Sequence, residues 1–412
     1  MTKNMEKVKL KDIALIYNGN SINAKEKSEK YTLKVDGRNY IGTKDIDYDG
    51  TVTYNTGVII PYSDTKFKIA PANCIFVCSE GGSAGRKTAH ITQEVCFGNK
   101  LYAIVNDKNL FVSKYVYYYT RYREFFEQFK ALMSGIIGGV SSKKFGEIEI
   151  PLPSLQEQER IVTKIEELFS KLDKGVEGLN KIKEQLKIYR QAVLKEAFEG
   201  GFCAKNIHPQ IVHISEVVRK DKNALKAGPF GSSLKKEMYV KSGYKIYGQE
   251  QVIGGDENIG HYYIDENKYK ELISCKIAPN DILISLVGTV GKVLILSANC
   301  KPGIINPRLI KVSLDEEKML SKYFKYYFES GYLRSLYKQK VHGATMDVLN
   351  MGMIKELPFP LYPVSEQEKI ICEIESRLSV CDKIEQTVNE SLQKAENLRQ
   401  SILKQTFEGK LV

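Results

Sequence analysis

The chain has 412 residues, of which 42% are hydrophobic, and its formal net charge is +11. This length is enough for two or three domains with buried cores, and no apolar run reaches the ~20 residues of a membrane span, so we expect a soluble, cytoplasmic protein. The eight cysteines form no CxxC pair, which argues against a disulfide framework or a zinc module. The positive charge favours an acidic partner, with nucleic acid as the first candidate.

The first region, residues 1–150, contains short β-type runs separated by Gly, Asn and Asp turns, which predicts a mixed α/β domain. A Gly-rich loop at 79–87 follows one such run and is either a phosphate contact or a strand-connecting turn. The tyrosines at 115–122 gather on one predicted helical face, which favours a core role over nucleic-acid stacking. The candidate nucleic-acid contacts of this region are Asn20, Ser83, Arg86, Lys87, Lys143 and Lys144.

Residues 151–202 predict one long helix. Ser154 is the predicted N-cap with Glu157 as its capping-box partner, and Gly200 ends the run. Apolar residues recur every seven positions, which is typical of a coiled-coil seam. The seam residues are Ile165, Leu172, Leu179, Leu186 and Val193.

The third region, residues 203–357, again has β-type runs, and its lysines and arginines concentrate between 217 and 245. The loop at 228–232 places hydroxyls beside lysines, and we expect its Phe230 to anchor the loop in the core. The polar side chains at 249–251 either read base edges or form a solvated strand end, and the Gly-rich loop at 287–292 aligns with the one at 79–87. The candidate contacts here are Ser232, Ser233, Lys235, Lys236, Gln249, Gln251, Thr289 and Lys292.

Residues 358–412 repeat the long helix. The segment from Glu157 to Gly200 recurs from Glu366 to Gly409 without insertion or deletion. Ser365 and Glu368 repeat the predicted capping box. The seam residues of this copy are Ile374, Val388, Leu398 and Ile402.

The repeat predicts an α+β protein with a pseudo-two-fold internal repeat. Two mixed α/β domains, 1–150 and 203–357, are separated by two long helices, 151–202 and 358–412, that pair as an antiparallel coiled coil. The alternative is that each amphipathic helix packs only on its own domain. Because the helices are alike while the globular regions differ, we interpret the chain as two different recognition modules on one symmetric frame.

No catalytic signature accompanies this architecture. The five histidines are scattered, and the segment 306–308 begins like an amino-methyltransferase motif but lacks its second proline and its aromatic residue. We therefore predict neither catalytic residues nor a metal site, and expect the chain not to be an enzyme.

Several segments resemble one known family. They are the run at 151–161, its echo at 360–370, the Phe-Glu-Gly endings at 198–200 and 407–409, and the Gly-Pro-Phe-Gly-Ser loop at 228–232. Over essentially the whole chain the sequence resembles the specificity subunits of type I restriction-modification enzymes. The first region lacks a clear counterpart of the Gly-Pro-Phe-Gly-Ser loop and offers 18–21 instead.

The resemblance implies that each target-recognition domain binds one half of a bipartite, asymmetric site in double-stranded DNA, while the coiled coil sets the spacing and docks partners. It also implies two modification subunits and two restriction subunits as partners, with S-adenosylmethionine, ATP and Mg²⁺ bound by those subunits and none by this chain. The sequence leaves one alternative open, a coiled-coil assembly scaffold whose basic domains bind protein or RNA.

Overall fold

The computed structural model describes residues 6–32, 36–134, 138–203, 207–230, 232–286, 291–330, 333 and 351–411. The chain divides into two compact units, and each is described by itself below. Unit 1 contains Met1–Asn180 and Asn389–Val412, and unit 2 contains Lys181–Val388. Each unit combines one globular region with part of both long helices, so the four predicted domain boundaries stay a prediction.

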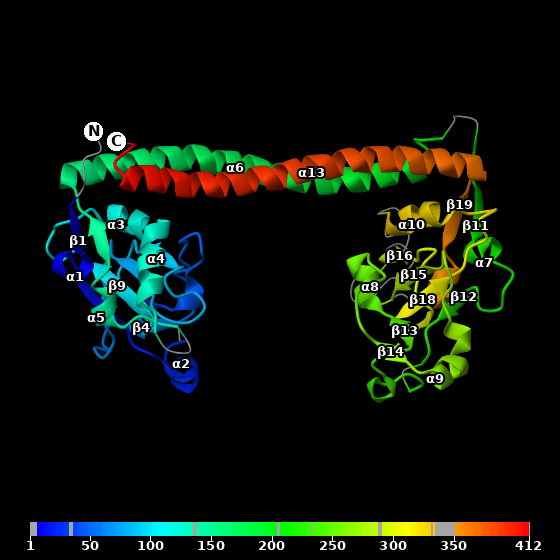
Figure 1. Cartoon of the computed structure of the whole chain (residues 1–412), viewed down its shortest axis with the longest axis horizontal. Helices are drawn as coiled ribbons and strands as arrows, with labels where there is room; N and C mark the ends of the chain where they lie inside the picture. Colours follow the sequence, from blue (N-terminus) through cyan, green and yellow to red (C-terminus); the bar gives the residue numbers. More distant parts are fainter. Residues whose placement is uncertain are drawn as a thin grey trace. The chain divides into compact units, whose positions relative to one another are not determined.

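The globular part of unit 1 contains two four-stranded sheets among its described residues (Figure 1). The sheet β2-β9-β6-β7 is antiparallel, and in the sheet β4-β3-β8-β5 the strands β3 and β8 are parallel. A separate antiparallel ribbon joins β1 to β10. The elements are β1 (Lys7–Lys9), α1 (Leu10–Ile13), β2 (Leu15–Asn18), α2 (Ala24–Lys30), β3 (Gly37–Ile41), η1 (Thr43–Asp45), β4 (Ile59–Pro61), β5 (Ile69–Ala70), β6 (Ile75–Cys78), β7 (Thr88–His90), β8 (Val95–Phe97), β9 (Leu101–Val105), α3 (Ser113–Thr120), α4 (Arg123–Leu132), α5 (Ser142–Phe145), β10 (Glu149–Pro151) and the long helix α6 (Leu155–Phe198).

Unit 2 repeats this topology within its described residues. Its antiparallel sheet has the order β12-β18-β15-β16, its second sheet is β14-β13-β17 with β13 and β17 parallel, and its ribbon joins β11 to β19. The elements are β11 (Gln210–His213), α7 (Ile214–Val217), β12 (Leu225–Ala227), η2 (Lys236–Met238), β13 (Tyr244–Tyr247), α8 (Gln249–Gly254), β14 (Tyr263–Ile264), α9 (Glu266–Glu271), η3 (Ile273–Cys275), β15 (Ile282–Ser285), β16 (Val293–Ile295), β17 (Gly303–Ile305), β18 (Leu309–Val312), α10 (Ser321–Glu329), α12 (Met351–Lys355), β19 (Pro358–Leu361) and the long helix α13 (Val364–Phe407).

The strand register identifies equivalent residues in the two units. The matching triplets across the antiparallel sheets are Asn18, Tyr102 and Val77 in unit 1 and Ala227, Ile310 and Ile284 in unit 2. Gly19 and Gly228, which follow the first member of each triplet, are therefore equivalent. The two globular regions therefore share a topology although their sequences differ.

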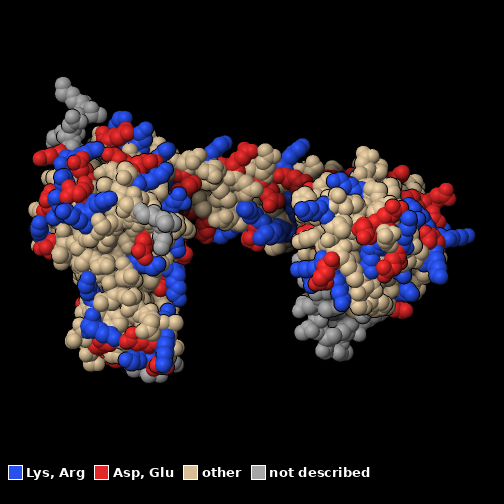
Figure 2. All heavy atoms as spheres, turned by 60° about the horizontal axis from the view of Figure 1, so that its bottom comes forward, with Lys and Arg blue, Asp and Glu red and all other residues tan. Residues whose placement is uncertain are grey.

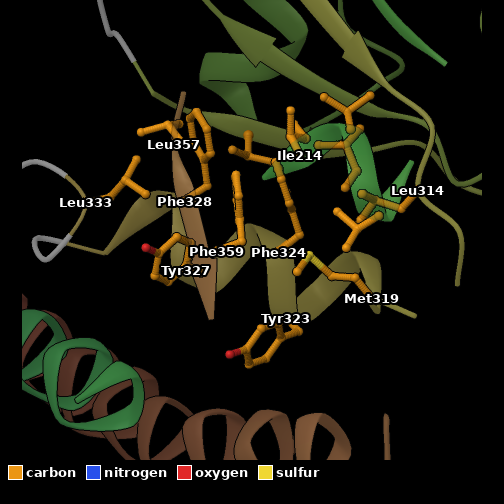
Figure 3. Close-up of a cluster of buried hydrophobic side chains, with 14 of the residues drawn as sticks. Ile214, Leu314, Met319, Tyr323, Phe324, Tyr327, Phe328, Leu333, Leu357 and Phe359 are labelled. Carbon is orange, nitrogen blue, oxygen red and sulfur yellow. The ribbon is translucent and has the colours of Figure 1, made fainter. Parts of the chain in front are cut away.

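Aromatic side chains of α3 and α10 lie in the cores. In unit 1 Tyr115 and Tyr119 are buried. In unit 2 Tyr323 and Phe324 belong to one buried cluster, with Phe324 directed toward Ile214 of α7 and Tyr323 directed away from it (Figure 3). The predicted core role of the tyrosine-rich helices is confirmed. Burial raises the pKa of the Tyr119 and Tyr323 hydroxyls above their ordinary value, and these hydroxyls donate to the Glu149 and Pro360 carbonyls.

Each globular region is fastened to the helix that follows it by the same hydrogen bonds. The Tyr115 hydroxyl donates to the Pro151 carbonyl at 2.7 Å, as Tyr323 does to Pro360 at 2.7 Å. The buried glutamines Gln158 and Gln367 also match, because each bonds backbone groups just before α3 or α10. The ion pairs Lys114–Glu166 and Lys322–Glu375 match as well. Burial and the Glu375 carboxylate raise the pKa of Tyr326 to about 12 beside the second ion pair.

The long helices begin and end largely where the capping signals place them. The Glu157 amide donates to the Ser154 hydroxyl at 3.4 Å, which confirms Ser154 as the N-cap of α6. The prediction for Ser365 is wrong, because α13 begins at Val364 and its first amides bond the Pro363 carbonyl instead. Gly200 and Gly409 both have positive φ, of 91° and 68°, and end their helices as predicted.

The first of the two predicted seam positions in each heptad is more buried than the second. Ile165, Leu186, Val193, Ile374, Val388 and Ile402 are buried, and Leu172 and Leu179 are half-buried. The prediction for Leu398 is wrong, because its side chain is 50% exposed. Leu398 lies at the second seam position of its heptad, and Ile384 and Tyr189, at the same position of their heptads, are also exposed. A single neighbouring helix covers only a narrow stripe of its partner, so the flanking position stays at the margin.

Within each unit the segments of α6 and α13 run antiparallel. In unit 1 Asp173 forms an ion pair with Arg399, and Ile165, earlier in α6, packs in one cluster with Phe407, later in α13. In unit 2 Arg190 forms ion pairs with Asp382 and Glu385 at 2.7 and 2.9 Å. Glu196, later in α6, pairs at 2.9 Å with Arg377, earlier in α13. The predicted α+β fold with two antiparallel long helices is confirmed, and none of the helices within the described ranges has the length and apolarity to span a membrane.

Candidate nucleic-acid interface

Four strand-end segments of unit 2 converge on one edge, which we call edge 2. They are the end of β12 at Gly228, the start of α8 at Gln249, the end of β15 at Ser285 and the β17–β18 turn at Asn306–Arg308. A Cβ on Gly228 would lie 1.8 Å from the Asn306 carbonyl oxygen, so this close approach requires glycine. The Gln249 amide donates to the Ser285 hydroxyl at 3.1 Å and accepts from the Arg308 guanidinium at 3.3 Å. Edge 2 thus gathers an amide, a hydroxyl and a guanidinium.

Unit 1 has an equivalent edge, which we call edge 1. A Cβ on Gly19 would lie 1.9 Å from the Phe97 carbonyl oxygen, matching the contact of Gly228. The Ser79 amide donates to the Lys100 carbonyl at 2.9 Å, just as the Leu286 amide donates to the Arg308 carbonyl at 3.0 Å. Lys100 is therefore the counterpart of Arg308, and residues 18–21 are the counterpart of 227–230. Lys100 also forms an ion pair with Glu80 at 3.0 Å.

The two Gly-rich loops occupy the same turn of the fold. The Gly85 amide donates to the Cys78 carbonyl and the Gly291 amide to the Ser285 carbonyl, and both glycines have positive φ, of 68° and 80°. The first loop connects β6 to β7 and is therefore at least a strand-connecting turn. Its close packing requires glycine, because a Cβ on Gly85 would lie 2.5 Å from the Phe129 ring. Thr289, predicted as a contact, lies outside the described residues.

The predicted contacts around the first Gly-rich loop differ in their surroundings. The Ser83 hydroxyl lies 3.3 Å from the Cys78 sulfur, inside the turn. Arg86 is exposed with its guanidinium 5.2 Å from the Phe126 ring centroid, and Lys87 donates to the Thr43 carbonyl at 3.3 Å. Lys292, the counterpart of Arg86, is exposed. Arg86 and Lys292 are the two of this group that present charge to solvent.

Gln251 is placed where it cannot reach a base. Its side chain is 0% exposed, its Oε1 accepts from the Gly248 amide at 2.7 Å and its Nε2 donates to the Ile259 carbonyl at 2.6 Å. Asp45 caps the equivalent Gly42 amide in unit 1 at 2.8 Å. The structure thus corrects the interpretation of Gln251: it is a helix cap, whereas Gln249 stands at edge 2.

Asn20 is also held by its own domain. Its side-chain oxygen accepts from the Lys68 amide at 2.7 Å and its side-chain nitrogen donates to the Lys66 carbonyl at 3.3 Å. Lys143 and Lys144 are exposed on the short helix α5 and are not among the residues that form edge 1.

The loop after β12 differs from the prediction in one respect. Ser232, Lys235 and Lys236 are exposed and Ser233 is half-buried, but Phe230, expected in the core, is 89% exposed. Leu234, at 5% exposure, is the residue that anchors this loop. The sequence-based expectation for Phe230 rested on its residue type alone. The turn instead directs Leu234 into the core and leaves Phe230 exposed.

Sequence reasoning missed Lys100, Arg308 and Thr43 as edge residues. Arg308 was considered only as part of an incomplete methyltransferase motif. All three are found by matching equivalent strand positions of the two units. The globular regions have diverged so strongly that the sequence shows this match only at its turns.

One face of each unit carries charges of both signs. Lysines and arginines are interspersed with carboxylates over the visible face of each unit (Figure 2). In the part of the chain that the structure describes, no group of three or more His, Cys, Asp or Glu side chains could hold a metal ion.

A family model described as "Type I restriction modification DNA specificity domain" matches residues 2–187 and 220–394. The chain is similar to the StySPI specificity subunit of Salmonella potsdam, with 28% identity over 84% of this chain and 76% of that protein. It is also similar to the EcoKI specificity subunit of Escherichia coli K12, with 27% identity over 84% of this chain and 76% of that protein. Both are type I restriction enzyme subunits by name.

Two solved structures share the fold. A chain from a study of complex assembly and conformational transition of the type I R-M system aligns with a TM-score of 0.73 at 16% identity, covering 100% of both chains. The HsdS subunit from Thermoanaerobacter tengcongensis aligns with a TM-score of 0.56 at 17% identity, covering 98% of this chain and 97% of that one. Since the family model matches well over half of the sequence, in both halves of the repeat, the chain belongs to the family of type I restriction-modification DNA specificity proteins.

Proposed function

We propose that this chain is the sequence-recognition subunit of a type I restriction-modification complex and that each unit reads one half of a bipartite, asymmetric site in double-stranded DNA. One observation carries the proposal: the two units have the same topology and the same fastening to the long helices, yet equivalent positions of edges 1 and 2 hold different side chains. Thr43 stands where Gln249 does, and Lys100 stands where Arg308 does.

The side chains of edge 2 fit base recognition. Arginine pairs with guanine and glutamine with adenine through two hydrogen bonds each in the major groove, and each good pair discriminates against a wrong base by ~1–3 kcal/mol. The bond between Gln249 and Arg308, at 3.3 Å, is long, and Arg308 is exposed, so its guanidinium can exchange this bond for one to DNA. Exposed Lys235, Lys236 and Lys292 suit phosphates, which position a protein without reading sequence.

The proposal divides the chemistry among subunits. This chain supplies recognition and no catalytic residue, while two modification subunits transfer the methyl group of S-adenosylmethionine and two restriction subunits use ATP and Mg²⁺. The paired long helices set the number of base pairs between the half-sites and dock the modification subunits. Their support is the family membership and the antiparallel helix pairing within each unit.

The experiment uses the complex purified from its host through a tag on this chain. Selection from a pool of random duplexes yields the site, and binding is then measured to the full site and to duplexes with only one half. We expect much weaker binding to either half alone, and a steep fall of affinity with salt. Equal binding to half and full sites rejects two-headed recognition, and binding without sequence preference favours the scaffold that binds protein or RNA.

A further inference from the structure

Phe230 has the highest exposed fraction, 89%, of the large apolar side chains that the structure describes. The backbone around it is held on both sides. The Gly228 amide donates to the Leu309 carbonyl at 3.0 Å, and the Ser233 amide donates to the Phe230 carbonyl at 2.8 Å. With Leu234 buried next to this turn, the ring is presented to solvent by a restrained backbone.

The residues around this turn are those of edge 2. Gly228, two positions before Phe230, lies directly against Asn306, whose turn carries Arg308. Lys235 and Lys236 follow five and six positions later and are exposed. The ring therefore stands among groups that suit phosphates and base edges, although it can form no hydrogen bond itself.

An exposed phenyl ring at such an edge has few apolar surfaces to meet on a duplex. Phosphates and sugars offer little, a thymine methyl group covers a small part of a ring, and the face of a base covers all of it. Proteins insert apolar side chains between base steps in this way, partly unstacking them. Unit 1 has Ser21 at the position equivalent to Phe230, two residues after Gly19.

We propose that the Phe230 ring enters a base step in the half-site read by unit 2 and stacks on the face of a base, and that unit 1 makes no such contact. This inference rests on the proposed DNA-recognition function and adds an asymmetry to it. Recognition by unit 2 then includes the ease with which one base step opens, besides the hydrogen bonds of Gln249 and Arg308.

The test compares the tagged complex with its Phe230→Ala and Phe230→Trp variants on duplexes that carry the selected site. 2-Aminopurine is placed at successive positions of each half, because its fluorescence rises when it is unstacked. We expect a rise in one half only, absent with Phe230→Ala and present with Phe230→Trp. Stacking on one base also predicts that Phe230→Ala weakens full-site binding by roughly 5- to 100-fold with the salt dependence unchanged.

Tyr262→Ala serves as the matched control, because Tyr262 is a 51% exposed aromatic residue of unit 2 that is not part of edge 2. It should bind as the unmodified chain does. Sequence-specific binding that Phe230→Ala leaves intact overturns the inference while the proposed function stands. If replacing thymines by uracil removes the difference between Phe230→Ala and the unmodified chain, the ring touches a methyl group and stacking is wrong. Absence of any site preference contradicts the proposed function itself.

Discussion

Replacing Gln367 by leucine tests what fastens the globular region of unit 2 to α13. Gln367 is 0% exposed, accepts from the Leu320 amide at 2.9 Å, and donates to the Lys318 and Tyr362 carbonyls at 2.7 and 2.8 Å. Leucine keeps most of the volume but leaves the buried Tyr362 carbonyl and two part-buried groups, the Leu320 amide and the Lys318 carbonyl, without this partner, at ~1–3 kcal/mol each. The gain from burying a more apolar side chain offsets about 1–2 kcal/mol. We expect a net loss of about 3 kcal/mol, which is roughly a 150-fold rise in local opening.

Hydrogen exchange followed by mass spectrometry measures this opening directly, because exchange of protected amides reports local unfolding. Peptides from 318–330 should exchange roughly 150-fold faster in Gln367→Leu, in proportion to the opening constant. Gln156→Leu, an exposed position of α6, is the matched control and should change nothing beyond about 0.5 kcal/mol. Unchanged exchange of 318–330 in Gln367→Leu would refute the reasoning, because these three bonds would then contribute nothing to holding the segment.

Three further predictions follow from other parts of the chain. Gly175→Ala should stabilise the protein by about 0.8 kcal/mol, because Gly175 lies in a helix and nothing lies within 4 Å of the added Cβ. Gly19→Ala should destabilise it, because the added Cβ would lie 1.9 Å from the Phe97 carbonyl oxygen. Urea denaturation measures both changes. Burial, and after it the charge of Lys114, hold the pKa of His90 below its ordinary value. The unfolded chain therefore takes up a proton at this histidine at higher pH than the folded chain does, and stability falls as the pH drops below about 6.5. His90→Gln should reduce this loss, measured as the difference between urea midpoints at pH 7.5 and 5.5. Deleting one heptad from each long helix should shift the preferred spacing of the selected half-sites, and an unchanged spacing would exclude the proposed spacing role of the helices.

The helical part of the fold could be predicted from the sequence because its signals are local and repeated. Heptad spacing, the Ser154 cap and the terminal Gly200 and Gly409 each act within one or two turns. Leu398 shows the limit of this reasoning, since a seven-residue period cannot say how much of each heptad a single partner helix covers. Ser365 shows another, because the Pro363 carbonyl already serves the first amides of α13.

The edges could be predicted only in part because they depend on strand register. The equivalence of Gly85 and Gly291 was visible in the sequence as two aligned turns. Gln249 and Gln251 are two residues apart and look alike in a sequence, yet one stands at edge 2 and the other caps the Gly248 amide in the interior. Which of the two lies at the edge is set by the turn at Gly248, and no local pattern of polar residues contains that information.

The contrast between the fastening bonds and the edges has a physical basis. Tyr115 and Tyr323 bond buried carbonyls, and the buried side chains of Gln158 and Gln367 bond buried or part-buried backbone groups, so a change there leaves a shielded group unsatisfied. Side chains at the edges, such as Lys100 and Arg308, are exposed and their replacement costs the fold little. Under the proposed function, a chain built this way can change what each unit recognises while both units keep the same attachment to the helices, because stability and the proposed recognition depend on different residues.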